Sequence, residues 1–196
     1  MKRSSSDARF TTAATEPGSR QRLFLALWPD DDARERLRVL GEQHVDSGRR
    51  TRPENLHATL VFLGAVDADT RACVERVAGS IDGRAFSVTF DGLEHRPRQA
   101  IVWAAASHVP TALARLVEQL RVGLTQCGFQ PERRPYHLHV TLARKVRRRQ
   151  TAVAIDPIVW HIGNFVLVES HTYASGASYQ VLRSWPLTGH ESSRRS

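Results

Sequence analysis

Two short segments of this chain repeat the same pair of chemically active side chains. His57 is followed two positions later by Thr59, and His139 by Thr141, each pair inside an apolar run. Successive side chains of an extended strand point to opposite faces, so each imidazole and its hydroxyl share one face while apolar neighbours anchor the other. Two such strands facing one cleft would bring both imidazoles and both hydroxyls around a small anionic group. That arrangement suits acid–base chemistry on the group.

One such pair alone would carry little information, because threonine is common in strands and an isolated strand histidine more often packs or faces solvent than catalyses. The repetition with matching parity and flanks, 82 positions apart, favours a functional pair. His137 shares the face of His139 and is expected to line the same groove. No carboxylate or cysteine lies at ligand spacing from His57 or His139, so we expect no metal and no cofactor.

The composition is that of an ordinary globular protein, with 41% hydrophobic and 24% charged residues among 196. No apolar run approaches the ~18 residues of a membrane-spanning helix, and the N-terminus lacks the apolar core of a secretory signal. Cys73 and Cys127 fall in separate helical patterns, so we expect reduced thiols in a cytoplasmic protein that does not enter the membrane. The net charge of +8 is carried almost wholly by arginine, which favours an acidic partner such as nucleic acid.

Polar terminal segments, 1–20 and 188–196, are expected to be flexible and to flank a single folded body at 21–187. Periodicity and turn residues predict amphipathic helices near 30–44, 74–81 and 110–127. Strands are expected at 22–28, at the first motif up to Gly64, at the second motif, and at 85–91, 99–106, 158–161, 165–171 and 179–185. The similar order of elements around the two motifs suggests a duplication into two α+β lobes.

The flanks of the motifs add a family resemblance. Arg52–Gly64 and Arg134–Arg144 resemble the two signature segments of the LigT-like two-histidine phosphoesterases, in the RNA 2′,3′-cyclic phosphodiesterase branch. The likeness includes the opening strand 22–27 and the segments 169–170 and 176–179, and it covers about residues 21–187. It implies an α+β, bilobal fold in which two antiparallel sheets form a concave central groove with helices on the outside.

The resemblance also implies an activity, the metal-independent hydrolysis of a terminal 2′,3′-cyclic phosphate to a 2′-phosphomonoester. His57 would then donate a proton and His139 accept one, while Thr59 and Thr141 bind phosphate oxygens. Two departures from the family pattern are visible. Leu138 stands where proline often precedes the second histidine, and no aromatic residue occurs at 48–52.

Arg144 lies five positions after His139 and would bind the phosphate and neutralise charge that develops on it. Strict alternation places Arg144 on the face opposite His139, so this role requires the strand to end or bulge before it. Arg134, Tyr136 and His137 are further candidates for the substrate groove. For Tyr136 and Trp103, packing is the simpler expectation, although either ring could stack on a base.

The partner expected from these features is RNA with a 2′,3′-cyclic phosphate end, bound by a monomeric protein. Two alternatives stay open at this point. The same fold and chemistry would act on a small cyclic nucleotide or an ADP-ribose cyclic phosphate, and a basic groove alone would serve a non-catalytic RNA-binding module. The presence of both histidine motifs argues against the non-catalytic reading.

Overall fold

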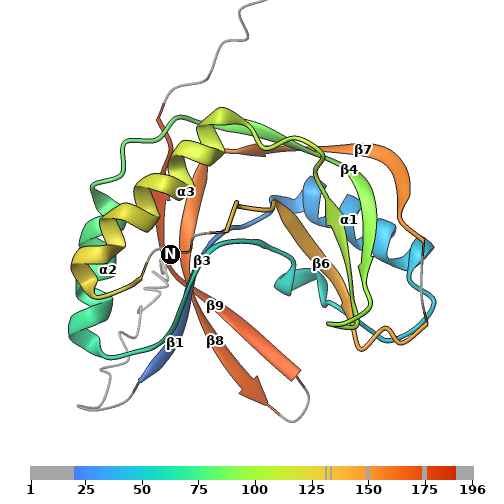
Figure 1. Cartoon of the computed structure of the whole chain (residues 1–196), viewed down its shortest axis with the longest axis horizontal. Helices are drawn as coiled ribbons and strands as arrows, with labels where there is room; N and C mark the ends of the chain where they lie inside the picture. The colour runs from blue at the N-terminus through green and yellow to red at the C-terminus, as the bar shows by residue number, and fades with distance from the viewer. Residues whose placement is uncertain (1–19, 131, 133, 149–150, 174–175, 189–196) are drawn as a thin grey trace, which may run out of the picture.

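The computed structural model of this chain describes residues 20–130, 132, 134–148, 151–173 and 176–188. The expected flexible segments at the termini therefore lie almost wholly outside the described residues. The described strands form two antiparallel sheets on either side of the middle of the molecule, and the helices lie on the outside (Figure 1). The α+β fold with two antiparallel sheets that the resemblance implies is confirmed.

The first sheet carries the first motif at its edge, in the strand order β3-β1-β8-β9. These strands are β1 (Gln21–Leu27), β3 (Ala58–Val66), β8 (Asn164–Tyr173) and β9 (Gly176–Pro186). Phe24, Ala26, Val166 and Val168 form a small buried cluster on one face of this sheet, separate from the main core.

The second sheet carries the second motif in strand β6, in the order β2-β6-β5-β4-β7. Its strands are β2 (Arg49–Arg50), β4 (Phe86–Arg96), β5 (Ile101–Ala105), β6 (His139–Arg144) and β7 (Val153–Ile162). Neither sheet comes from one half of the sequence, since β8 and β9 complete the first sheet and β2 joins the second. The two lobes therefore do not correspond to consecutive halves of the sequence, because each sheet takes strands from both halves.

The helices cross between the lobes and tie them together. They are α1 (Asp31–His44), α2 (Ala68–Gly79) and α3 (Thr111–Gly123), with short 3-10 turns η1 (Pro53–Asn55) and η2 (Leu124–Cys127). Helix α1 follows β1 of the first sheet but packs against β6 and β7 of the second, while α3 follows β5 and packs against β3. No helix in the described part of the chain is long and apolar enough to cross a membrane.

One hydrophobic core joins both sheets and the helices. Leu37 of α1 and Leu113, Leu116 and Leu120 of α3 are almost completely buried in it. Each such side chain contributes about 1.5–3 kcal/mol when it leaves water. Because the lobes share this core, the groove between them has rigid walls.

Strand β3 continues past Gly64 to Val66, so the expectation that Gly64 ends the strand is wrong. Gly64 adopts a φ of +75°, and the register of β1 against β3 shifts beside it, between Leu23 and Phe24. Glycine tolerates this left-handed conformation, so the strand bulges here and continues.

The two cysteines are joined rather than reduced. Cys73 of α2 and Cys127 of η2 form a disulfide, with their Cα atoms 5.7 Å apart. The expectation of two free thiols is wrong because it treated the two helical patterns as separate, whereas α2 packs against both α3 and η2.

Replacing both cysteines by serine should lower the free energy of unfolding by about 2–4 kcal/mol, because the bond links residues 54 positions apart and restricts the unfolded chain. Urea unfolding of the oxidised protein and of the double variant measures the loss. A reducing agent should reproduce the loss in the unmodified protein and leave the double variant unaffected. Equal stability of all samples would contradict the bond.

Candidate active site

His57 is oriented by the turn that precedes β3. Its Nδ1 lies 2.7 Å from the carbonyl oxygen of Asn55. A carbonyl oxygen can only accept a hydrogen bond, so Nδ1 carries a proton and donates it. Nε2 is therefore the ring nitrogen that can take up or release a proton. Asn55 is itself buried, and its side-chain amide donates to the carbonyl of Ala177 at 2.9 Å. The first sheet thus fixes His57 through the start of β9.

His139 is held in the same way at the start of β6. Its Nδ1 lies 2.9 Å from the carbonyl oxygen of His137, again two residues earlier in the chain. Leu138 between them is fully buried, and its carbonyl accepts from the backbone N–H of Ala106 at 3.4 Å. Both motifs therefore present an imidazole whose Nδ1 is committed to the backbone and whose Nε2 is available for chemistry.

Aromatic rings surround His57. The Trp28 indole stacks on the imidazole at a centroid distance of 5.7 Å and an interplanar angle of 12°. Phe24 lies 4.9 Å away and the edge of Tyr179 5.1 Å away. Burial among these rings disfavours the imidazolium and lowers the pKa of His57 to about 4, although the hydrogen bond to the Asn55 carbonyl acts in the opposite direction.

His139 has a tryptophan neighbour of its own. The centroid of the Trp103 ring lies 4.4 Å from that of the imidazole. The guanidinium of Arg96 lies over the Trp103 ring, 4.8 Å from its centroid. Burial is again the main cause that lowers the pKa of His139, and the charges of His137, Arg144 and Arg96 lower it further. At neutral pH the free protein therefore holds both motif histidines mainly as neutral imidazoles.

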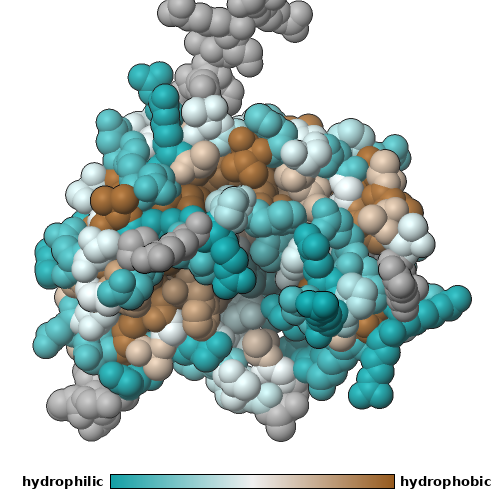
Figure 2. Space-filling model, viewed as in Figure 1, coloured by the Kyte–Doolittle hydropathy of each residue, from teal (hydrophilic) through white to brown (hydrophobic). Residues whose placement is uncertain are grey.

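One residue of each motif lines a shared cavity: Thr59 and His139 border the same space of about 680 Å³, although they belong to different sheets, whereas His57 and Thr141 are not among its lining residues. The charge of His139 lowers the pKa of His57, which indicates that the two imidazoles lie near one another. The hydroxyl of Tyr136 donates to the carbonyl of Thr59 at 3.0 Å and ties the segment before β6 to strand β3. Figure 2 shows the surface hollowed near the middle of the molecule, with hydrophilic side chains beside the hollow.

Arg144 meets the geometric condition that its expected role requires. The register of β5 against β6 passes from Val102–Ala143 to Trp103–Thr141, so Leu142 is an extra residue in β6. Both Leu142 and Ala143 are buried, and Arg144 is exposed after them. This bulge shifts the alternation by one residue and returns Arg144 to the face of Thr141. In agreement, the charge of Arg144 lowers the pKa of both motif histidines.

Three further candidates for the substrate groove line the same 680 Å³ cavity but differ in their contacts. Arg134 is exposed and pairs with Glu132 at 3.3 Å. The hydroxyl of Tyr136 is used in the bond to Thr59, and burial raises the pKa of this phenol. His137 is exposed, with its ring 5.9 Å from that of His139. Among the described residues, no group of three or more histidine, cysteine or acidic side chains is placed to hold a metal ion.

Sequence reasoning missed the residues that set the environment of His57. Phe24 lies in β1 and Trp28 follows directly after it. Both share a face with Ala26, because the three residues are spaced two positions apart. Because β1 is apolar on both faces, its alternation could not show which face meets the groove. Asn55 carried a signal only as part of the resembling segment, and its buried amide is visible only in the structure.

Comparisons with known proteins show which family this chain belongs to. The model of the 2′-5′ RNA ligase superfamily matches residues 27–173. The RNA 2′,3′-cyclic phosphodiesterase of Escherichia coli strain K12 is 31% identical over 175 residues, which cover 86% of this chain and 97% of that protein. The protein of the same name from Archaeoglobus fulgidus is 32% identical over 138 residues, 68% of this chain and 77% of that protein. A solved structure of E. coli LigT with 3′-AMP has a TM-score of 0.78 at 30% identity, over 86% of this chain and 99% of that one.

The placement of Arg144 can be checked by titrating the histidines by NMR. In the unmodified protein the pKa of His57 should lie at about 4, and that of His139 below the usual ~6.5. In Arg144→Gln both pKa values should rise, because the positive charge of Arg144 disfavours each imidazolium in the unmodified protein and the variant lacks it. Arg148→Gln is the matched control, since its guanidinium pairs with Asp46 at the surface. Unchanged values in Arg144→Gln would place that arginine away from the site.

Proposed function

Because this chain belongs to the 2′-5′ RNA ligase superfamily, we propose that it is an RNA 2′,3′-cyclic phosphodiesterase that hydrolyses a terminal 2′,3′-cyclic phosphate to a 2′-phosphomonoester. The observation that carries the proposal is the matched pair of histidines, each with Nδ1 bonded to the backbone at residue i−2. Relatives named RNA 2′,3′-cyclic phosphodiesterase, 31–37% identical to this chain, support the same reaction.

The reaction needs one base and one acid. The neutral Nε2 of His139 accepts a proton from water as the water oxygen forms a bond to phosphorus. The bond between phosphorus and O3′ breaks, and the protonated Nε2 of His57 gives its proton to O3′. The products are a 2′-phosphomonoester and a free 3′-hydroxyl. Two imidazoles supply both proton transfers, so the proposed mechanism uses no metal ion.

The other site residues act on the phosphate itself. Thr59 and Thr141 share the faces of the histidines and donate hydrogen bonds to the non-bridging oxygens without adding charge. Arg144 adds a fixed positive charge near the same oxygens, which stabilises the negative charge that develops as the water attacks. The bulge at Leu142 is what makes this contribution of Arg144 possible.

Because the pKa of His57 is low, the bound substrate must help to protonate His57 before it can act as the acid. In the free protein, burial and the charge of Arg144 disfavour the imidazolium form of His57. A bound cyclic phosphate carries a negative charge into the cleft, and that charge favours a proton on the neighbouring imidazole. Proton uptake is therefore coupled to substrate binding.

Removal of either histidine should abolish most of the activity. A general acid or base contributes about 10²- to 10⁴-fold, so His57→Ala and His139→Ala should each lower kcat by that order on an oligoribonucleotide with a 2′,3′-cyclic phosphate end. Assays in EDTA with identification of the product isomer measure this. His108→Ala, an exposed loop histidine, is the matched control. Near-normal turnover in either motif variant, or loss of activity in EDTA that a metal restores, would overturn the mechanism.

The pH dependence should differ between kcat/KM and kcat. Activity rises as His139 loses its proton and falls as His57 loses its own. In the free protein both pKa values lie below ~6.5, so the optimum of kcat/KM should lie on the acid side of that value. In the complex the phosphate raises the pKa of His57, so the optimum of kcat should lie at higher pH. Coincident profiles would show that substrate binding does not favour protonation of His57.

A further inference from the structure

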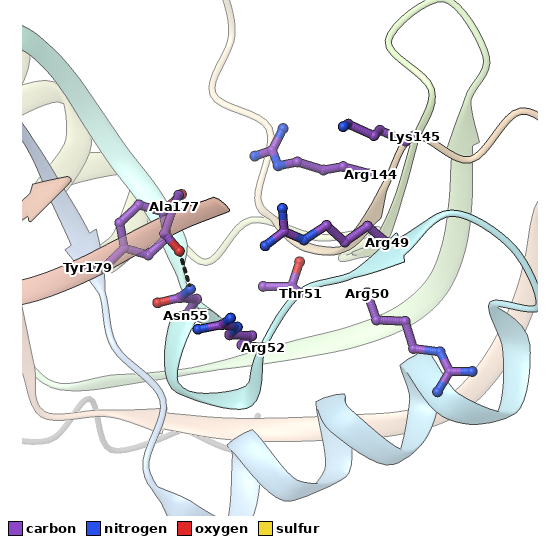
Figure 3. Close-up of a pocket in the computed structure, with 9 residues that line it drawn as sticks. All are labelled: Arg49, Arg50, Thr51, Arg52, Asn55, Arg144, Lys145, Ala177 and Tyr179. Carbon is purple, nitrogen blue, oxygen red and sulfur yellow. Dashed lines mark hydrogen bonds between the residues drawn. The ribbon is translucent and has the colours of Figure 1, made fainter. Parts of the chain in front are cut away.

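A second, strongly basic cavity adjoins the catalytic cleft. It has a volume of about 130 Å³ and lies where β2, η1, the end of β6 and the start of β9 meet (Figure 3). Among the described residues, none that lines it is acidic. The residues that line it are Arg49, Arg50, Thr51, Arg52, Asn55, Arg144, Lys145, Ala177 and Tyr179. The described walls of the cavity therefore concentrate positive charge.

The fold forces two of these arginines together. Strand β2 pairs antiparallel with β6, and Arg49 stands directly opposite Arg144. The backbone N–H of Thr51 donates to the carbonyl of Leu142 at 2.7 Å and fixes this pairing beside the bulge. An anion placed between the two guanidinium groups would be attracted by both charges.

The walls of the cavity also bring backbone close to this charge. Gly176 adopts a φ of +125°, and a Cβ built at this position would meet the guanidinium of Arg49, so the start of β9 lies directly beside this charge. Figure 3 shows the side chains of Arg49, Arg144 and Lys145 reaching toward the same space, whereas that of Arg50 turns away from it. Consistent with this, Nε of Arg50 donates to the carbonyl of Val45 at 3.3 Å.

The cavity is continuous with the environment of the catalytic histidines. Tyr179 lines it and also contacts His57, with 5.1 Å between ring centroids. Arg144 lines it and lowers the pKa of both His57 and His139 by its charge. Tyr179 and Arg144 therefore connect the basic cavity to the surroundings of the motif histidines.

We propose that this basic cavity binds a second phosphate of the substrate, the one on the 5′ side of the terminal nucleotide. The inference rests on the proposed function, because it assumes a cyclic phosphate in the cleft. Guanidinium groups bind phosphate oxygens in a bidentate geometry, and Arg49 and Arg52 both line this cavity. The cavity therefore makes the protein select an RNA end over a cyclic mononucleotide.

Two substrates that differ by one phosphate test this directly: adenosine 2′,3′-cyclic phosphate, and the same compound with a 5′-phosphate. The 5′-phosphate should raise kcat/KM by about 10-fold or more, the effect expected for hydrogen bonds to a charged group, and the gain should shrink as salt is added. In Arg49→Gln and Arg52→Gln the ratio of the two kcat/KM values should fall toward 1. In the matched control Arg50→Gln the ratio should stay at the unmodified value.

The outcomes separate this inference from the function on which it rests. If the unmodified protein hydrolyses neither compound and also fails on an oligoribonucleotide with a 2′,3′-cyclic phosphate end, the proposed function fails. If it hydrolyses both with equal kcat/KM, the function stands and the second phosphate site is wrong. If the 5′-phosphate helps but neither Arg49→Gln nor Arg52→Gln changes the ratio, the phosphate binds elsewhere and the cavity is not its site. Circular dichroism of each variant confirms that the comparison is made between folded proteins.

Discussion

The hydrogen bond between each motif histidine and the carbonyl two residues before it constrains the rest of the site. A peptide carbonyl cannot rotate apart from its backbone, so the orientation of His57 depends on the turn that contains Asn55. That turn is held by the bond from Asn55 to Ala177, which lies 122 positions later in the chain. A strand from the C-terminal part of the chain therefore fixes the ring of His57 near its beginning, so the orientation of the proposed acid depends on the exchange of strands between the lobes. The second motif meets the same requirement through the buried Leu138.

The packing that holds the imidazoles also decides their charge. Trp28, Phe24 and Tyr179 fix the plane of the His57 ring, but the same contacts exclude the water that would solvate an imidazolium. Rigidity and protonation thus oppose each other in the free protein. Arg144 sharpens the conflict, since its charge disfavours the protonated ring while the cleft is empty. An anionic substrate resolves it, because the negative charge attracts both Arg144 and the proton on His57. On this account the acid is formed only when the cleft holds a ligand of the right charge.

The sequence was sufficient for the parts of the site that follow from local alternation, and insufficient where distant segments meet. The period of two in a strand places His57 beside Thr59 and His139 beside Thr141 without any knowledge of the fold. The alternation does not reveal the bulge at Leu142, because in the sequence two consecutive apolar residues, Leu142 and Ala143, are equally consistent with the end of the strand. The disulfide and the crossing of α1 and α3 between the lobes are likewise products of packing between elements far apart in the chain. The periodicity of each helix predicts which of its faces is apolar, but not which strand or helix that face packs against.

The bulge at Leu142 links the proposed chemistry to the proposed phosphate site in the basic cavity. It returns Arg144 to the face of the motif, and the carbonyl of the extra residue, Leu142, accepts the bond from Thr51 that positions β2. One irregularity in β6 therefore sets the charge beside the histidines and also places Arg49 opposite Arg144. A regular strand would remove both effects together, since Arg144 would turn to the far face and the anchor of β2 would shift by one residue. If a phosphate binds between Arg49 and Arg144 as we propose, the pairing of β2 with β6 places both guanidinium groups where they can bind it, so one backbone pairing serves both the cleft and the basic cavity.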